Sequence, residues 1–434
     1  MHPLHLFRTN VLIFIALQLI GSLIAATDNA NWPRWRGPAD SGSTVAGKYP
    51  TKWDASEMLW TTKLPGKGCS TPIVWNNRIY LTAPVGGKDA VLAFDLSGKE
   101  LWNTSLGPET VGRHRNGSGS NPSAVTDGKG IFVHFKSGNL ASLNMDGSIR
   151  WRANLVEKYG PVKLGWDHGT SPVLTERNVV VARIHGGDSW LAAFDKSTGK
   201  VRWKTDRKFE SPRENDNGYS TPVVIHHEGK EALLAWGSDH LTAYSAETGK
   251  LLWTCGDFNP QATPNWPAIS SPIVVGEVVV VAFGRVDRGG VQLHGIKLGG
   301  QGDVTKTHRL WRREDVGAFV PSPAEYRGRV YVLSDRGQID CIDPKTGKVE
   351  WTETLPRSSS NFYASPTIAA GVMYAVREDG TVFAVRVDGG FALLAENKFA
   401  DRLVAAIVPL SDRLLVRGME NLYCVANREA ASGQ

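Results

Sequence analysis

Cysteine is scarce in this chain, because its 434 residues include only Cys69, Cys255, Cys341 and Cys424. No two of them are adjacent, and their spacing forms no disulfide framework. No cysteine and histidine spacing suits zinc, and the sequence has no His-Glu-x-x-His motif and no phosphate-binding P-loop. We therefore expect buried free thiols and no metal site.

Long hydrophobic runs and blocks of basic residues are also missing beyond the N-terminus. Every apolar run after residue 26 has only the length of a strand, so we expect no membrane span once a signal peptide is removed. The formal net charge is +6, but lysine and arginine are spread along the sequence and form no block that would grip phosphates. Nucleic acid is therefore not an expected partner.

Residues 1–26 have the composition of a secretory signal peptide. His5 and Arg8 give a weakly basic start, an apolar core follows, and small residues stand at Ala25 and Ala26. The core is short for a spanning helix, and an uncleaved anchor is the alternative. We expect an exported protein, periplasmic or secreted, with an N-terminal extension over 27–57 and a disordered tail over 426–434.

One sequence motif recurs along the rest of the chain: a small residue and proline, a β-branched run, Asp-x-x-Thr-Gly-Lys, and then tryptophan. The first four intervals between its prolines are 50 residues each. These prolines are Pro72, Pro122, Pro172, Pro222, Pro272, Pro323 and Pro366. Self-similarity at such a period indicates a repeat architecture. Each unit contains four short runs separated by turn residues, which predicts an antiparallel four-stranded meander.

Units of this kind predict an all-β fold, an eight-bladed β-propeller of four-stranded antiparallel blades over residues 58–425. Seven inner strands follow the prolines, and Ala405–Leu410 supplies an eighth. The last blade lacks a fourth strand, whereas Met58–Leu64 has an outer-strand pattern and no blade of its own. We predict that this N-terminal strand completes the last C-terminal blade and closes the ring. In the fifth unit, Gly299–Thr305 replaces the tight turn and is interpreted as a flexible flap or a partner-contacting loop.

The tryptophan of each unit is expected to have a structural role. The turn glycine supplies the positive φ that the hairpin needs, and the tryptophan packs its ring against the neighbouring unit. This docking role is predicted for Trp60, Trp102, Trp151, Trp203, Trp253, Trp311 and Trp351. A Gly199→Ala change should therefore impair folding and leave function untouched.

The Asp-x-x-Thr-Gly-Lys-x-x-Trp elements and the Ser-Pro inner strands resemble the PQQ-like repeat propellers, over roughly residues 50–425. That superfamily includes the quinoprotein alcohol dehydrogenases and the outer-membrane assembly lipoprotein BamB. Trp32–Pro38 looks like the opening of a secreted branch abundant in planctomycete bacteria, and Gly302–Thr305 and Leu394–Asn397 are similar to it as well.

The resemblance implies features that can be sought in the sequence. Quinoprotein enzymes hold the quinone PQQ under a ring made by two adjacent cysteines, and some attach haem at Cys-x-x-Cys-His; neither motif occurs here. We therefore expect no cofactor, neither PQQ nor calcium. A BamB-like lipoprotein would carry a lipid-anchored cysteine directly after the signal, whereas the first cysteine here is Cys69, so we expect no lipid attachment.

In a propeller, the loops that enter the inner strands gather around one mouth of the central channel. Here they carry aromatic, charged and amide side chains of the kind that small-molecule and glycan sites use. The candidates are Arg113, His114, Arg115, Trp166, Asp167, His168, Asn217, Tyr219, Trp266, Phe362 and Tyr363. Asp167 and His168 are the candidate acid and base, and Arg113 is a candidate anion clamp. Alternatively, the aromatic residues only plug the channel.

The leading hypothesis from the sequence is a secreted, non-catalytic propeller. It would bind a protein or an extracellular or cell-envelope polymer through the loops at one mouth, and we expect a monomer. Two alternatives stay open: a PQQ-dependent oxidoreductase that uses the funnel, and a propeller that binds or acts on glycans.

Overall fold

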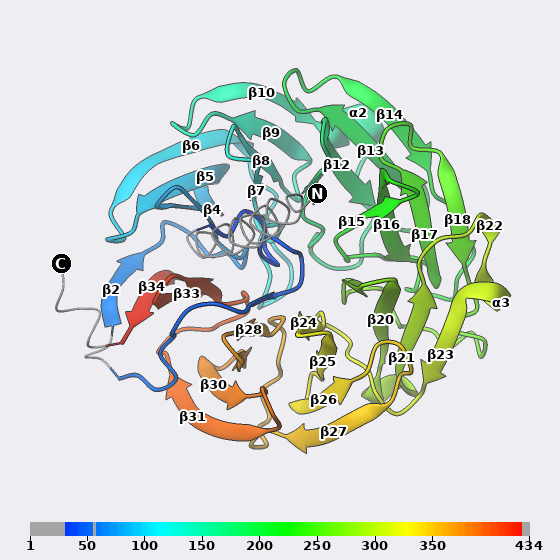
Figure 1. The fold of residues 1–434 in the computed structure, drawn as a ribbon. Helices are drawn as coiled ribbons and strands as arrows, with labels where there is room; N and C mark the ends of the chain where they lie inside the picture. Colours follow the sequence, from blue (N-terminus) through cyan, green and yellow to red (C-terminus); the bar gives the residue numbers. More distant parts are fainter. Residues whose placement is uncertain (1–30, 55–57, 428–434) are drawn as a thin grey trace, which may run out of the picture.

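The computed structural model describes residues 31–54 and 58–427, so the predicted signal peptide and residues 428–434 of the predicted tail lie outside the described residues. Eight sheets surround a central axis and form a closed ring (Figure 1). The prediction of an eight-bladed β-propeller is therefore confirmed. None of the helices in this part of the chain is long and apolar enough to cross a membrane.

In blades 1 to 7 the four main strands form an antiparallel meander that runs in chain order from the channel to the rim. Blade 1 contains β3 (Ile73–Trp75), β4 (Arg78–Val85), β5 (Lys88–Asp95) and β6 (Glu100–Pro108). Blade 2 contains β7 (Val125–Thr126), β8 (Ile131–His134), β9 (Asn139–Leu143) and β10 (Ile149–Asn154), and α2 (Leu155–Tyr159) follows it. Blade 3 contains β11 (Val173–Leu174), β12 (Asn178–Arg183), β13 (Trp190–Asp195) and β14 (Val201–Asp206).

The next three blades follow the same order. Blade 4 contains β15 (Val223–His227), β16 (Lys230–Gly237), β17 (His240–Ser245) and β18 (Leu251–Cys255). Blade 5 contains β19 (Ile273–Val275), β20 (Val278–Arg285), β21 (Gly290–Lys297) and β23 (Arg309–Arg313), with η2 (Val286–Arg288) between β20 and β21. Blade 6 contains β24 (Ala324–Tyr326), β25 (Arg329–Leu333), β26 (Gln338–Ile342) and β27 (Val349–Thr354).

The last two blades each take in a strand from the N-terminal part of the chain. Blade 7 contains β28 (Thr367–Ala369), β29 (Val372–Val376), β30 (Thr381–Arg386) and β31 (Ala392–Lys398), and β1 (Ser43–Thr44) pairs in parallel with β28. Blade 8 contains β32 (Val408–Leu410), β33 (Arg413–Arg417) and β34 (Asn421–Ala426), and its outermost strand is β2 (Met58–Lys63).

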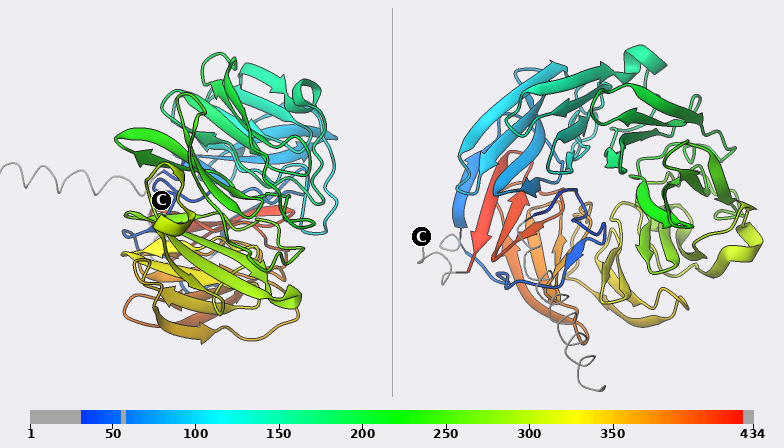
Figure 2. Two further views of the ribbon diagram at one scale, coloured as in Figure 1. Left: turned by 90° about the vertical axis from the view of Figure 1, so that its right-hand side faces the viewer. Right: turned by 45° about the horizontal axis from the view of Figure 1, so that its top comes forward.

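The pairing of β2 with β34 closes the ring as predicted. The two strands are antiparallel, with Trp60 opposite Cys424 and Thr61 opposite Tyr423. They lie side by side at the left of Figure 1 and again in the tilted view of Figure 2. Because the last blade takes its outer strand from the start of the propeller, neither end of the ring leaves an unpaired edge at this junction.

The hydrophobic core consists of layers between neighbouring blades. The middle strands are continuous apolar runs, such as Val179–Ala182 in β12, because a blade on each side covers both of their faces. The layer between blades 4 and 5, for example, contains the fully buried rings of Trp236, Trp253 and Phe283.

The repeated tryptophans lie at the joints between blades. Trp151 of blade 2 donates its indole N–H to the carbonyl of Lys196 in blade 3 at 2.9 Å, and its ring faces Gly199 in the same turn. The same arrangement puts Trp60, Trp102, Trp203 and Trp311 beside the turn glycines of the following blades. Trp253 and Trp351 contact blades with different turns; Trp351 packs against Phe391 at 6.0 Å between ring centroids.

The segment Gly299–Thr305 extends the neighbouring blade. Its strand β22 (Gly302–Asp303) pairs in parallel with β18, opposite Trp253 and Thr254, and α3 (Thr305–His308) leads back to β23. This segment therefore covers the outer edge of blade 4 (Figure 1).

Residues 31–54 form a strap that crosses one end of the channel (Figure 1). Trp32 bridges to Val74 in blade 1, and β1 reaches blade 7 on the other side. Between them the buried guanidinium of Arg36 donates to the carbonyls of Pro323 and Pro366, at 2.5 and 2.9 Å. The strap therefore ties together blades that are distant in sequence and closes this end.

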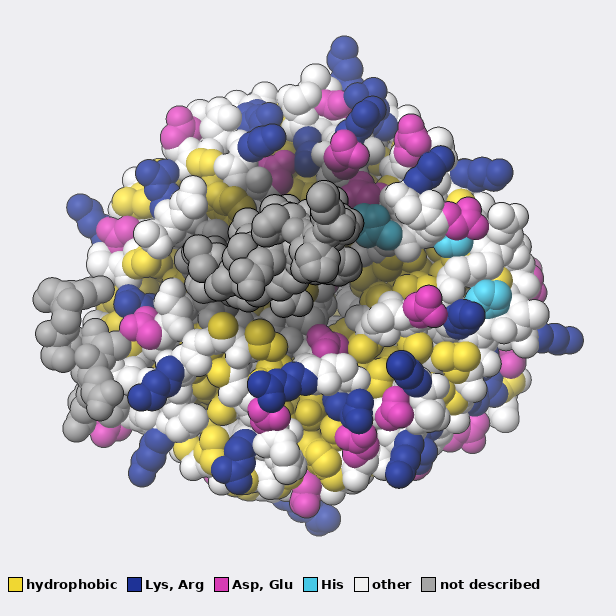
Figure 3. Space-filling model, in the orientation of Figure 1, with side chains coloured by type: hydrophobic (Ala, Val, Ile, Leu, Met, Phe, Trp, Pro, Cys, Tyr) yellow, Lys and Arg dark blue, Asp and Glu magenta, His cyan; other side chains and the backbone are white. Residues whose placement is uncertain are grey.

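On the face that carries the strap, the described residues outside the grey region of Figure 3 form no large patch of one charge. Lysine and arginine side chains alternate with aspartate and glutamate around this face (Figure 3). This agrees with the even spread of basic residues in the sequence.

Candidate functional site

A cavity of about 420 Å³ occupies the channel between the strap and the loops at the other mouth. Most of its lining consists of residues at or before the starts of the inner strands, whereas the strap lies among residues that follow those starts. Trp35 of the strap contacts both regions and forms part of the cavity floor. The strap therefore turns an open channel into a pocket with one accessible end.

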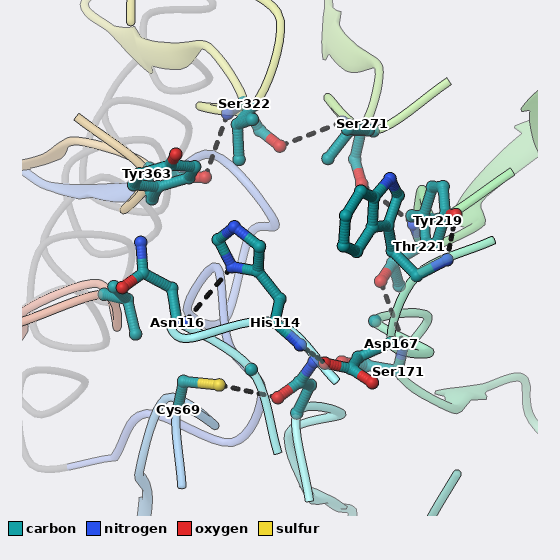
Figure 4. Close-up of a pocket in the computed structure, with 18 of the residues that line it drawn as sticks. Cys69, His114, Asn116, Asp167, Ser171, Tyr219, Thr221, Ser271, Ser322 and Tyr363 are labelled. Carbon is teal, nitrogen blue, oxygen red and sulfur yellow. Dashed lines mark hydrogen bonds between the residues drawn. The ribbon is translucent and has the colours of Figure 1, made fainter. Parts of the chain in front are cut away.

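A ring of hydroxyl groups surrounds the floor of this cavity. In six successive blade pairs, a backbone N–H of one blade donates to a serine or threonine oxygen of the next, at 2.9 to 3.1 Å. The accepting side chains are Ser123, Ser171, Thr221, Ser271, Ser322 and Ser365, and several are visible in Figure 4. Blade 8 has Ala406 at this position, so the hydroxyl ring is open there.

The loop that enters blade 2 crosses the accessible mouth; we call residues 109–121 the crossing loop. On one side the backbone N–H groups of Arg113 and His114 donate to the Asp167 carboxylate at 2.8 to 2.9 Å. On the other side Arg115 and Asn116 reach Glu378 of blade 7, at 3.0 and 2.8 Å. The crossing loop is thus fixed at both sides of the ring.

The carboxylate of Asp167 holds the crossing loop in place. Its side chain is 3% exposed and pairs with the Lys136 ammonium at 2.6 Å, in addition to the two backbone N–H bonds. Asp167 lines the cavity, but both oxygens of its carboxylate already accept hydrogen bonds from these three donors. The geometry therefore gives Asp167 a structural role.

His168 lies outside the cavity, behind the mouth loops. Its Nε2 faces His134 Nδ1 at 3.1 Å, and we call these two side chains the buried histidine pair. Burial, with the nearby positive charge of Arg183 as a smaller cause, lowers the pKa of His168 to about 4. The pKa of His134 is also lowered, chiefly by burial. Both rings are therefore neutral at pH 7 and out of reach of a ligand in the cavity.

His114 projects from the crossing loop into the cavity (Figure 4). Its Nδ1 accepts the backbone N–H of Asn116 at 3.1 Å, which leaves Nε2 as the donor in the neutral ring. Its ring meets Trp166 edge-on at 5.5 Å and lies 6.1 Å from Tyr363, between centroids. His114 is therefore the polar centre of an aromatic wall.

The remaining predicted residues divide into two groups. Trp166, Tyr219 and Tyr363 line the cavity, and the Tyr219 hydroxyl accepts the backbone N–H of Trp166 at 3.0 Å. Burial raises the pKa of Tyr219 to about 12. The second group does not line the cavity: Trp266 and Phe362 are buried between blades, and Asn217 bonds to neighbouring loops. The side chains of Arg113 and Arg115 are exposed around the mouth.

Sequence reasoning missed several groups that shape the site. Glu378 stands in a turn between the second and third strands of its blade, a connection that also reaches the mouth. Trp35 comes from the N-terminal extension, for which no role was predicted. The serine and threonine residues of the hydroxyl ring belong to the repeated Ser-Pro motif, for which only a strand was predicted. A search of both kinds of loop on the mouth side would have found Glu378.

Cys69 is the one cysteine that lines the cavity within the described residues. Its thiol lies 2.6 Å from Asn121 Oδ1, and burial raises its pKa to about 11. The thiol is therefore protonated at neutral pH and is a poor nucleophile. All four cysteines are unpaired; Cys69 is half-buried and the other three are buried.

The side chains of the cavity do not fit PQQ held by calcium. Within residues 31–54 and 58–427, no three histidine, cysteine, aspartate or glutamate side chains gather as a metal site. PQQ is a tricarboxylate and needs cations around it. The lining cation Arg285 already pairs with Asp287 at 2.9 Å, and the Glu214 carboxylate would repel such a ligand.

Comparisons with known proteins agree with the fold. A family model described as outer membrane protein assembly factor BamB matches residues 44–164, 144–309 and 302–392. The outer membrane protein assembly factor BamB of Yersinia pestis is 22% identical over 336 residues, which span 77% of this chain and 68% of that protein.

Solved structures give the same result. BamB from Moraxella catarrhalis has a TM-score of 0.61 at 14% identity, over 85% of this chain and 99% of that one. A europium-containing methanol dehydrogenase has a TM-score of 0.70 at 12% identity, over 94% and 100%. At such identities these similarities show the fold and nothing further about activity.

Proposed function

Because this chain belongs to the family described as outer membrane protein assembly factor BamB, we propose that it is an exported, non-catalytic scaffold that binds a partner protein at the accessible mouth of its channel. A protein-binding role is the general expectation for a propeller of this family. The finer proposal concerns the place of binding and the absence of catalysis.

The observation that carries the proposal is the exposure of Trp166 at the mouth. This tryptophan is 50% exposed, although most large apolar side chains of the propeller are buried. The exposed side chain of Arg113 stands on the crossing loop close by. Tryptophan and arginine are the residues most enriched where protein interfaces concentrate their binding energy.

The engagement of the two predicted acid and base residues supports a scaffold over an enzyme. Asp167 is held by Lys136 and two backbone amides, and His168 is sealed behind the loops. A general acid or base has to reach a substrate proton within hydrogen-bond distance. His168 does not meet that condition in this geometry, and the Asp167 carboxylate, although it lines the cavity, is already occupied by three donors.

Site-specific photocrosslinking tests the proposal. The full chain is expressed in the organism that produces it, with a photoreactive amino acid in place of Trp166. A control variant has the same amino acid in place of Leu310, which is exposed on the outer strand β23. We expect a discrete protein adduct from position 166 and none from position 310. Equal adducts from both positions, or an adduct to a polysaccharide alone, would contradict a protein partner at this mouth.

A further inference from the structure

We propose that the cavity beneath the crossing loop binds a neutral, hydroxylated ligand: a monosaccharide, or the terminal unit of a neutral oligosaccharide. This inference goes beyond the proposed scaffold role and does not depend on it. It concerns the interior of the channel, whereas the protein partner would contact the mouth, and Trp166 lies at the boundary between these two surfaces.

The hydroxyl ring has hydrogen-bond donors that are not used within the protein. Each of the six accepting side chains uses its oxygen to receive a backbone N–H from the neighbouring blade, and none donates its own hydrogen to an acceptor among the residues that the structure describes. All six line the cavity. The floor therefore presents O–H donors to whatever lies above it, and these need a ligand rich in oxygen acceptors.

An aromatic wall stands above this floor. Trp166, Tyr219 and Tyr363 line the same cavity as the hydroxyl ring, and Trp35 contributes to its floor. Flat rings pack against the C–H faces of a sugar while its hydroxyls reach polar groups around the edge. His114 Nε2 adds a donor on the mouth side of the cavity. Apolar walls with a few placed polar groups are the usual design of small-ligand sites.

The charged side chains of the lining favour a neutral ligand. The Asp167 carboxylate is neutralised by Lys136, and the Arg285 guanidinium is neutralised by Asp287. Among the lining groups of the described chain, Glu214 is the charged side chain for which there is no ion pair. An anionic ligand would meet this carboxylate without a free cation among the described lining groups to compensate it, whereas a neutral sugar can donate two hydroxyls to it.

The charge and the aromatic wall alone would also suit a quaternary ammonium group. The hydroxyl ring decides against that ligand, because a cation without acceptors would leave six buried O–H groups unpaired. Size and access agree with a sugar. The volume of about 420 Å³ falls within the range of small-ligand pockets, and half-exposed Trp166 marks an opening beside the crossing loop.

Calorimetric titration of the full chain tests the inference with three groups of probes. The neutral probes are glucose, N-acetylglucosamine and cellobiose; the anionic probes are glucuronate and glucose 6-phosphate; the cationic probe is choline. We expect saturable binding of at least one neutral probe with a Kd below about 10 mM, and at least tenfold weaker binding of its anionic counterpart. Failure of every neutral probe, or tighter binding of an anionic probe or of choline, would overturn the inference.

Variants then place the ligand in the cavity. Thr221→Val keeps the shape of a ring member but removes its O–H, and Tyr363→Ala removes one aromatic wall. We expect about tenfold weaker binding of the neutral probe for Tyr363→Ala and several-fold weaker binding for Thr221→Val. The control Leu310→Ala, on the rim, should bind as the parent chain does.

The same variants separate this inference from the scaffold proposal. Thr221→Val lies below the crossing loop, so it should leave the crosslink from position 166 unchanged while it weakens the sugar. Thermal unfolding shows whether each variant is folded. The conservative variant Tyr363→Phe keeps the aromatic ring and should therefore still bind the sugar. A folded Tyr363→Ala variant that binds the sugar as tightly as the parent would place the ligand elsewhere and refute the inference.

Discussion

Gly199→Ala tests the coupling between neighbouring blades. Gly199 has φ +69°, in the turn between β13 and β14, and a methyl group built there would stand 2.6 Å from two carbons of the Trp151 ring. Two costs therefore add. The left-handed backbone costs an alanine about 1 kcal/mol. Moving the indole costs about 1 to 3 kcal/mol in packing and threatens its hydrogen bond to Lys196.

The chain supplies a matched control for this experiment. Gly229 has φ +75° in the turn between β15 and β16, and a methyl group there would meet nothing within 4 Å. Gly229→Ala therefore carries the backbone cost without the collision. We expect Gly199→Ala to lower the free energy of unfolding by about 2 to 4 kcal/mol and Gly229→Ala by about 1 kcal/mol.

Urea unfolding followed by tryptophan fluorescence measures both variants. The difference between them isolates the contact with Trp151, because the backbone term is common to both. If the two variants unfold at the same urea concentration, the tryptophan does not dock on the turn glycine, and the structural role assigned to the repeated motif is wrong.

Three further predictions concern the hydroxyl ring, the buried histidine pair and the crossing loop. The backbone N–H of Ser365 has no acceptor among the described residues, and Ala406→Ser should supply one. We expect the free energy of unfolding to rise by about 0.5 to 1.5 kcal/mol in the same urea assay. A lower free energy of unfolding would contradict this prediction. Burial lowers the pKa of His168 to about 4, so the stability from its neutral form is complete above about pH 6.5 and is lost as pH falls towards 4. A His168→Gln variant should show a shallower decline between those values, and an unchanged decline would assign it to other groups. Glu378→Ala should release one side of the crossing loop and speed hydrogen exchange at residues 113–118, and unchanged protection there would show that the anchor is unimportant.

The architecture could be predicted because its signals are local and repeated. Turn residues and β-branched runs recur in every unit, and Met58–Leu64 had an outer-strand pattern without a blade to complete. The exact spacing of the prolines was misleading in one place. Ser171 precedes Pro172 as in the other units, but Ser123 follows Pro122. In blade 2 the hydroxyl position is therefore shifted by two residues relative to the proline. The hydroxyl ring becomes visible only when the strands are placed in space.

The candidate site could be predicted only in part, because its decisive contacts join distant parts of the sequence. The candidates that line the cavity, such as His114 and Tyr363, come from the loops expected at the mouth. The bond between Arg115 and Glu378 spans 263 residues and has no local signature. Burial was also invisible: Asp167 and His168 have the residue types of an acid and a base, and only their surroundings show that they are occupied or sealed.

The strap and β2 together impose an order on the biogenesis of this protein. Arg36 finds its acceptor at Pro366 across 330 positions of sequence, and β2 has to wait for β34. During synthesis, blades 1 to 7 can each form their own meander, whereas β2 stays without a partner until Asn421–Ala426 has been made. Assembly of the circle is thus a late, slow step governed by contacts of very high sequence separation. A chain stopped short of residue 421 would be an open arc with an exposed outer strand at its beginning, a ready target for chaperones and for aggregation.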